Sequence, residues 1–121
     1  MKTILLVEDD PFLIDIYSTK LKEVGFNVGI AEDGEEAIRK IKEELPDLVL
    51  LDIVLPTVNG WEILRTIKKD ESLEKLKVVI LSNLGEKKEV EKGIKAGAAK
   101  YLVKAHYTPS EVVREIKEML E

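Results

Sequence analysis

The sequence predicts an α/β protein built on one five-stranded parallel sheet with five helices on its two faces. Short apolar runs alternate with longer segments whose apolar residues recur at helical spacing. This alternation is typical of βα units joined by right-handed crossovers. The run 48–52, four apolar residues followed by an aspartate, favours a strand buried on both faces. A doubly wound sheet of this size most often has strand order 2-1-3-4-5, and its winding then reverses between strands 1 and 3.

Composition favours a single domain, which we expect to span residues 1–121. The chain is 45% hydrophobic and 36% charged, so it can bury a core beneath an ionic surface. A net charge of −5 argues against direct binding of nucleic acid. The lack of cysteine excludes a disulfide framework and a thiolate metal site. No apolar run has the length of a membrane span or a signal peptide, so we expect a cytoplasmic protein without a membrane partner.

Each predicted strand precedes a predicted helix. The strands are Thr3–Val7, Asn27–Ala31, Leu48–Asp52, Lys77–Ser82 and Lys100–Val103. The apolar faces of four helices are Leu13, Ile16, Tyr17, Leu21 and Val24; Ala37, Ile38, Ile41 and Leu45; Ile63, Leu64 and Ile67; and Val112, Val113, Ile116 and Leu120.

Capping residues support these boundaries. Asp10-Pro11 pairs an N-cap with proline at the first helical position. Asp33 and Asn59 are each followed three residues later by glutamate, and Thr108-Pro109-Ser110-Glu111 is a full capping box. Gly25 follows the first helix, where a left-handed residue is favoured.

The fourth helix is the weakest of the five. Its apolar stripe is little more than Val90 and Ile94, and Gly93 lies in its interior at a cost of ~1 kcal/mol relative to alanine. A marginal helix suits an element that repacks between two states. The alternative is that Gly93 simply allows close packing. The alternating lysines and glutamates of 86–92 indicate a solvated face.

Three carboxylates are expected at one edge of the sheet. Glu8 and Asp9 follow the first strand, Asp52 ends the third, and these strands are neighbours in the proposed order. Such a cluster must protonate or find a cation, and all-oxygen ligation favours Mg²⁺. Asp10 is expected to turn away and cap its helix. The alternative is that Glu8 and Asp9 are loop charges and Asp52 only ends its strand.

A hydroxyl and an ammonium belong to the same edge. Ser82 ends the fourth strand and Lys104 follows the fifth. Phosphoryl transfer to an aspartate requires a carboxylate nucleophile, a metal and a positive charge beside the phosphoryl oxygens. The combination therefore indicates Asp52 as the nucleophile, which would become an acyl phosphate.

These residues resemble the receiver domain of bacterial two-component response regulators over essentially the whole chain. The resemblance is carried by four stretches in the expected order: Val7-Glu8-Asp9-Asp10; Leu51-Asp52-Ile53-Val54-Leu55-Pro56 with Asn59-Gly60; Leu81-Ser82; and Ala96-Gly97-Ala98 leading to Tyr101-Leu102-Val103-Lys104. It implies a flavodoxin- or CheY-like fold and a stand-alone signalling switch. Such a domain is not an enzyme, because it catalyses only its own phosphorylation and dephosphorylation.

The resemblance also implies a role for each site residue. Asp52 would accept a phosphoryl group from a histidine kinase or phosphotransfer protein. Mg²⁺ would be bound by Asp9, Asp52 and the backbone carbonyl of Val54, with Glu8 acting through water. Lys104 would contact the phosphate, and Ser82 and Tyr101 would form the switch pair. Phosphorylation would reshape the face made by the fourth helix, fifth strand and fifth helix, which would bind a partner or form a homodimer.

Some positions depart from the family pattern or tune it. Ala105 follows Lys104 where the family usually has proline, often in a cis bond, and Asn83 replaces the usual small residue after Ser82. Asn83 would add a polar contact to the phosphoryl group or restrict access to it. Val54 and Leu84 stand two residues past Asp52 and Ser82, where receiver side chains flank the path of the hydrolytic water. Because both are apolar, the resemblance implies a long-lived phosphoryl group.

Three rival functions remain. A degenerate receiver that acts only as an interaction module would not need the intact acidic set. A flavodoxin-type binding module needs a phosphate-cradling loop, whereas Glu8-Asp9-Asp10 would repel phosphate. A phosphatase with an aspartate nucleophile usually has a second aspartate two residues on, where this chain has Val54.

Trp61, which opens the third helix, is expected to be a packing residue.

Overall fold

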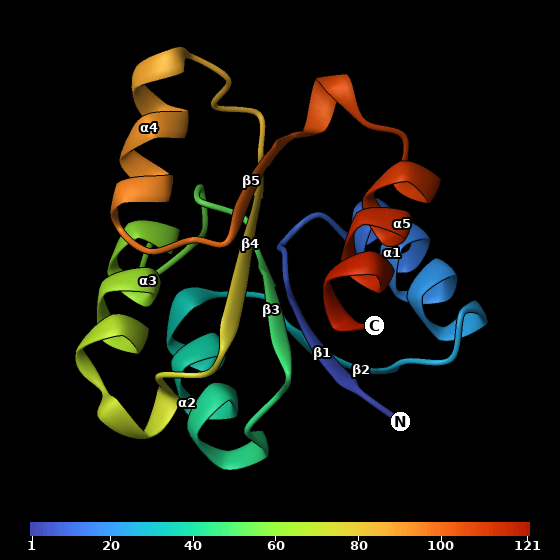
Figure 1. Cartoon of the computed structure of the whole chain (residues 1–121), viewed down its shortest axis with the longest axis horizontal. Coiled ribbons are helices and arrows are strands. Elements are labelled where there is room, and N and C mark those ends of the chain that lie inside the picture. The colour runs from blue at the N-terminus through green and yellow to red at the C-terminus, as the bar shows by residue number, and fades with distance from the viewer.

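The computed structural model describes all 121 residues and follows the predicted alternation of strands and helices (Figure 1). No helix is both long enough and apolar enough to cross a membrane. The elements are β1 (Thr3–Val7), α1 (Pro11–Glu23), β2 (Asn27–Ala31), α2 (Gly34–Glu44), β3 (Leu48–Leu51), α3 (Gly60–Lys69), η1 (Glu71–Leu73), β4 (Lys77–Ser82), α4 (Lys87–Lys95), β5 (Lys100–Val103), η2 (Lys104–His106) and α5 (Pro109–Leu120).

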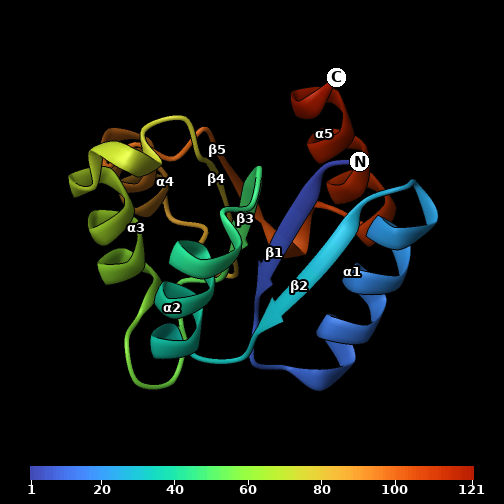
Figure 2. The same ribbon diagram turned by 90° about the horizontal axis from the view of Figure 1, so that it is seen from below.

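All five strands are parallel and lie in the order β2-β1-β3-β4-β5, which confirms the predicted topology. Helices α1 and α5 cover one face of the sheet, and α2, α3 and α4 cover the other (Figures 1 and 2). The winding reverses at the β1–β3 pair. Open α/β sheets place their ligands beyond the carboxyl ends of the strands at such a reversal.

The core consists of two apolar layers, one on each face of the sheet. Alternate strand residues enter opposite layers, so Leu5 and Val49 face α2 to α4, while Leu6 and Leu50 face α1 and α5. Every residue of β3 is buried, as predicted for a central parallel strand. Each buried leucine or isoleucine contributes roughly 1.5–3 kcal/mol, and these layers hold the strand ends in place.

The predicted caps are present. Asp10 accepts a hydrogen bond from the backbone N–H of Phe12 at 2.9 Å, and it therefore points along α1. Asp33 and Asn59 cap α2 and α3 in the same way. Thr108 and Glu111 form a reciprocal capping box on α5. Gly25 has a φ of +99°, in the left-handed region that favours glycine.

The structure corrects three boundary predictions. Strand β3 ends at Leu51, one residue before the predicted end, because the chain turns at Asp52 and its carboxylate accepts a hydrogen bond from Val54 N–H. Val24 and Leu45, predicted to lie on buried helix faces, are 41% and 63% exposed. Both are C-cap residues, and the chain leaves the helical path there, with Leu45 left-handed at φ 46°.

Helix α4 lies close to the sheet but buries few of its side chains. Ile94, predicted to line its apolar stripe, is 47% exposed, while Gly93 is buried. A Cβ atom at Gly93 would lie 2.7 Å from a ring carbon of Tyr101 and 2.9 Å from Ile80. Gly93 therefore provides the close approach of α4 to the sheet, which supports the packing interpretation of this glycine.

The capping box of α5 gives a pH-dependent stability prediction. The backbone hydrogen bond from Thr108 holds the pKa of Glu111 below its ordinary value of 4.5. The ionised carboxylate therefore stabilises the fold above pH 4.5, and this contribution is lost as the pH falls through the lower folded-state pKa. Thr108→Ala should destabilise the domain by ~1 kcal/mol at neutral pH.

In urea unfolding, the free energy of unfolding of Glu111→Ala should be lower than that of the parent at neutral pH. This difference should become smaller at acidic pH. Glu118→Ala is the matched control, since Glu118 is exposed on the same helix and takes no part in the cap. A gap that stays constant across the pH range, or one equally large for the control, would contradict this prediction.

Candidate functional site

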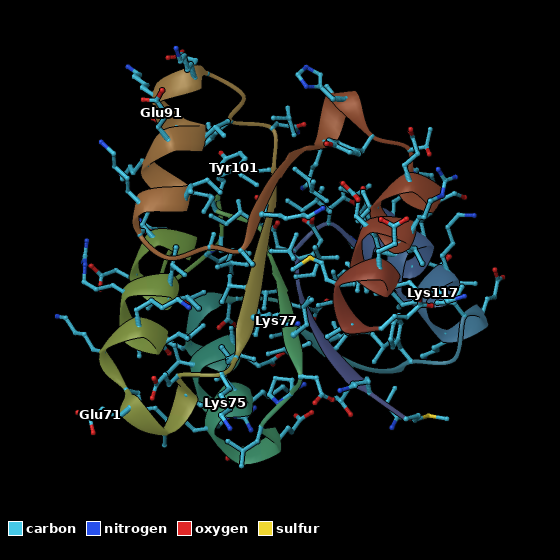
Figure 3. All side chains as sticks on the ribbon, in the orientation of Figure 1. Glu71, Lys75, Lys77, Glu91, Tyr101 and Lys117 are labelled. Atoms are coloured by element: carbon cyan, nitrogen blue, oxygen red, sulfur yellow. The ribbon has the colours of Figure 1, made fainter.

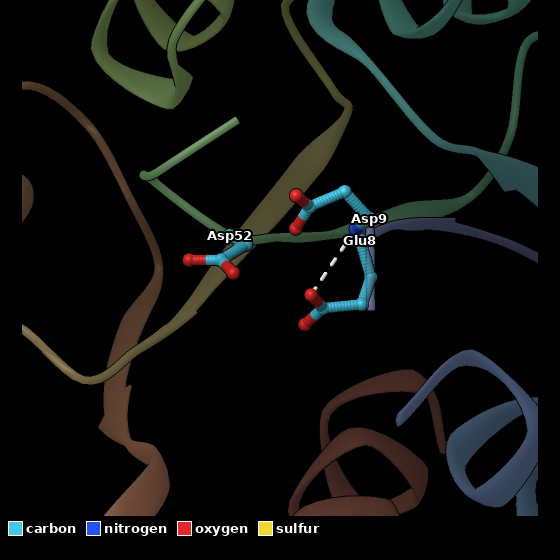
Figure 4. Close-up of side chains that lie close together, drawn as sticks. All are labelled: Glu8, Asp9 and Asp52. Atoms are coloured by element: carbon cyan, nitrogen blue, oxygen red, sulfur yellow. Dashed lines mark hydrogen bonds between the residues drawn. The ribbon is translucent and has the colours of Figure 1, made fainter. Parts of the chain in front are cut away.

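Three carboxylates meet where β1 and β3 end. Val7 pairs with Leu51 in the sheet, and the N–H of Asp52 donates to the carbonyl of Val7 at 3.1 Å. This register brings together one carboxylate oxygen each from Glu8, Asp9 and Asp52, all within 4.8 Å of one another (Figure 4). The sheet thus gathers the three acids that the sequence placed at its edge.

The three carboxylates differ in environment. Glu8 and Asp52 are only 3% and 7% exposed, whereas Asp9 is exposed. Glu8 accepts hydrogen bonds from the N–H groups of Asp9 and Asp10 at 3.1 and 3.2 Å, the first of which is dashed in Figure 4. Asp52 Oδ1 accepts one from Val54 N–H at 3.3 Å. Backbone donors therefore orient the two buried acids.

Lys104 brings a positive charge to this cluster from the end of β5. Its Nζ lies 2.7 Å from Glu8 Oε1 and 2.9 Å from Asp52 Oδ2, and the side chain is 12% exposed. The peptide bond to Ala105 is trans, as are all the others, and the chain enters η2 at Lys104. The lysine thus reaches the acids with alanine in the position after it.

The pKa shifts reflect burial and pairing together. Burial raises the pKa of Glu8; the hydrogen bond from Lys104 opposes this, and the nearby charge of Asp52 adds to it. Burial would lower the pKa of Lys104, but the hydrogen bonds and charges of Glu8 and Asp52 outweigh it, so its pKa is raised. Lys104 is therefore firmly cationic. With all three acids ionised, the cluster keeps an excess of two negative charges.

The donor set suits a hard divalent cation. Its three side chains offer only carboxylate oxygens, and the backbone carbonyl of Val54 lies two residues past Asp52. Oxygen-only ligation with an excess of two negative charges matches Mg²⁺ or a similar ion. His106, the only histidine, is exposed in η2 and is not among the clustered residues.

Ser82 and Tyr101 are linked through one backbone segment. Ser82 is fully buried at the end of β4, and its Oγ accepts a hydrogen bond from Leu84 N–H at 3.2 Å. The hydroxyl of Tyr101 donates to the carbonyl of Leu84 at 2.5 Å. Figure 3 shows Tyr101 between α4 and the sheet, and burial raises its pKa. The role of Leu84 as a backbone bridge has no sequence signal, because any residue type can supply these groups.

The three residues associated with phosphoryl lifetime lie at the surface. Val54 is 64% exposed, Leu84 is 36% exposed, and Asn83 is also exposed. The backbone N–H of Val54 donates a hydrogen bond to Asp52 of the acidic cluster. Their side chains thus reach solvent one or two residues beyond Asp52 or Ser82 in the chain.

Known proteins share this arrangement of sequence and fold. The family model for the response regulator receiver domain matches residues 4–117. The chain is 37% identical to the phosphate regulon transcriptional regulatory protein PhoB of Rhizobium meliloti (strain 1021). It is 34% identical to the alkaline phosphatase synthesis transcriptional regulatory protein PhoP of Bacillus subtilis (strain 168). The matches cover 97% and 98% of this chain but 51% and 48% of those proteins, so the chain spans about half their length.

A solved structure shows the same fold. The response regulator receiver domain protein (CheY-like) from Methanospirillum hungatei JF-1 matches with a TM-score of 0.89 at 31% identity. The match covers 99% of this chain and 94% of that one. Since the family model and a relative of this similarity agree along nearly the whole chain, the protein belongs to the response regulator receiver domain family.

Proposed function

We propose that this domain is a phosphorylation-activated switch in which Asp52 accepts a phosphoryl group from a histidine kinase or phosphotransfer protein. The observation that carries the proposal is the setting of Asp52. Its carboxylate is 7% exposed, lies 2.9 Å from Lys104 Nζ and shares a cluster with Glu8 and Asp9. Phosphoryl transfer to a carboxylate requires a nucleophilic carboxylate, a nearby positive charge and acidic residues that can bind a cation, and these groups are present here.

The reaction is a substitution at phosphorus. A carboxylate oxygen of Asp52 attacks the phosphoryl group of a phosphohistidine, and a P–O bond forms as the P–N bond breaks. The bond's electron pair returns to the imidazole, which takes up a proton from solvent. Lys104, now shared between Glu8 and Asp52, would pair with a phosphoryl oxygen. Bound Mg²⁺ would supply further positive charge for those oxygens.

The acidic residues would divide the work of holding the cation. Asp9, Asp52 and the backbone carbonyl of Val54 are the proposed direct ligands, and Glu8 would act through water. The exposed Asp9 and buried Glu8 suit these different roles, because Glu8 already accepts two backbone hydrogen bonds and one from Lys104. A cation here would also reduce the repulsion among the three acids.

The signal would pass from Ser82 to α4. A phosphoryl group on Asp52 offers new acceptors to the Ser82 hydroxyl and would draw residues 82–84 toward it. The backbone of Leu84 is hydrogen-bonded to the side chains of both Ser82 and Tyr101, so a displacement of Leu84 would change the position of the Tyr101 ring. That ring packs against Gly93 of α4. The face made by α4, β5 and α5 would then bind a partner or pair with a second copy.

The first prediction concerns the phosphorylation site. With Mg²⁺ and acetyl phosphate, the parent should gain one phosphoryl group by intact mass, and Asp52→Asn should gain none, because the amide is not a nucleophile. Asp15→Asn is the control, since Asp15 is exposed on α1 away from the acidic cluster. Undiminished labelling of Asp52→Asn would refute the assignment.

The second prediction concerns the metal. Asp9→Ala should weaken Mg²⁺ binding by roughly tenfold or more, because ligand charge largely sets the affinity of such sites. Without Mg²⁺ the same variant should unfold at a higher temperature than the parent, because one repelling charge is removed. Calorimetric titration and thermal unfolding test both effects, with Asp15→Ala as control. Equal Mg²⁺ affinity in Asp9→Ala and the parent would exclude direct ligation.

The third prediction concerns lifetime. Val54 and Leu84 offer no lone pair to orient the hydrolytic water, so the acyl phosphate should decay slowly, as suits a regulator of gene expression or development. The double variant Val54→Asn with Leu84→Glu should decay faster, by roughly fivefold for each polar contact of ~1 kcal/mol. Decay is followed after removal of the phosphodonor, with the exposed Val24→Asn as control. Hydrolysis of the parent within seconds, or an unaccelerated double variant, would contradict the idea.

A further inference from the structure

A basic groove lies between α3 and α4, which run side by side on one face of the sheet (Figures 1 and 2). The groove has a volume of about 290 Å³ and is open to solvent. We call it the α3–α4 groove. Its lining is Trp61, Arg65, Lys68, Lys69, Lys92 and Ala96. Four of these six residues are cations, although the whole chain has a net charge of −5.

Most cations of this groove have no direct carboxylate partner, although Lys68 also lines a neighbouring depression with Asp70, Glu71 and Glu74. Lys68, Lys69 and Lys92 have no carboxylate within 4 Å, and only Arg65 is paired, with Glu62 on its own helix. Two other lysines of α4, Lys87 and Lys88, each pair with a nearby glutamate, whereas Lys95 has no carboxylate within 4 Å. The groove is therefore a positive site on an acidic protein, and it would attract negative charge.

Two of the lysines are held at the groove wall by packing. Lys92 Nζ lies 4.3 Å from the centroid of the Trp61 ring, in a cation–π contact that joins α4 to α3. The stem of Lys68 lies against Gly97, where a Cβ atom would come within 2.7 Å of Lys68 Cε. Side chains already ordered lose less entropy when a ligand binds.

Helix electrostatics explain only part of this arrangement. Lys68 and Lys69 lie in the last turn of α3 and Lys92 in the last turn of α4, where cations stabilise the helix carboxyl end. Helix α1 has the same feature in Lys20 and Lys22, and the depression beside it includes Glu23 and no aromatic residue. Arg65 pairs with Glu62 and Trp61 packs against the core, so these roles leave unexplained only that both residues lie with three lysines in one groove.

We propose that the α3–α4 groove docks an acidic segment of a protein partner. Arg65 and Lys69 are four residues apart on α3, so they present positive charge about one turn, ~5.4 Å, apart. Carboxylates at similar spacing along a peptide would meet them. Tryptophan and arginine are the side chains most enriched at the energetic centres of protein interfaces. An open groove of this volume fits peptide side chains better than a whole enclosed small molecule.

The test uses fluorescently labelled oligoglutamate as the probe, with oligoglutamine of equal length as its neutral match. Oligoglutamate should raise the anisotropy saturably at low ionic strength, oligoglutamine should not, and added salt should weaken binding. Trp61 is the only tryptophan, so its emission should change over the same concentration range. Saturable binding with no response from Trp61 would place the peptide elsewhere and overturn the proposal.

Charge-neutralising variants locate the binding. Arg65→Gln, Lys69→Gln and Lys92→Gln should each weaken oligoglutamate binding by roughly two- to fivefold, as expected for an exposed ion pair. Lys22→Gln is the matched control, an exposed lysine in the last turn of α1, and should bind as the parent does. Equal weakening by Lys22→Gln would show that binding follows overall charge and overturn the proposal.

Two further measurements address other occupants. ATP binding that is tighter than oligoglutamate binding and sensitive to Lys69→Gln would indicate a small polyanion instead. In sedimentation, the unphosphorylated chain should not self-associate through this groove, so Lys69→Gln should leave its oligomeric state unchanged. If the chain self-associates and Lys69→Gln abolishes this association, the groove binds a second copy of this chain and the proposal fails.

Discussion

The ion pairs of Lys104 with Glu8 and Asp52 are the interaction on which the site depends. Lys104 and Glu8 are 96 positions apart, and they meet because β1, β3 and β5 end at the same edge of one sheet. Two buried carboxylates beside a third would otherwise repel one another with little solvent to screen them. A single ammonium makes their burial tolerable and still leaves negative charge for a divalent ion. The electrostatics of the site therefore depend on the sheet topology.

The two carboxylate partners of Lys104 differ in how many backbone hydrogen bonds hold them. Glu8 is held by two backbone N–H groups as well as by Lys104, so it keeps its orientation if the lysine moves. Asp52 has one backbone donor, at 3.3 Å. A phosphoryl oxygen can compete for the lysine on the Asp52 side while Glu8 still anchors the ammonium. In the proposed reaction, Lys104 would therefore pair with the added negative charge of the phosphoryl group while it stays anchored to Glu8.

The sequence predicted the features that local rules govern. Strand order follows from the βα alternation, and four caps follow from Asp10, Asp33, Asn59 and Thr108 at the helix starts. The errors fall where periodicity stops being informative: Val24 and Leu45 continue a helical pattern past the point at which the helix ends. The Leu84 bridge and the contact of Lys92 with Trp61 could not be predicted, because backbone groups and exposed lysines carry no sequence signal.

Helix α4 contacts both the Tyr101 ring and Trp61 of the α3–α4 groove. Only Gly93 is fully buried on it, so few contacts fix its position, and local contact density governs how easily a segment moves. One of these contacts is with the Tyr101 ring, whose hydroxyl is bonded to Leu84 beside Ser82. Another contact joins the adjacent Lys92 to Trp61 in the α3–α4 groove. Because Lys92 and Gly93 are adjacent on α4, the proposed shift of Tyr101 would alter the groove, and the proposed occupant of the groove would bias the position of Tyr101. If both proposals hold, the two sites would be thermodynamically coupled through α4, and that coupling would act in both directions.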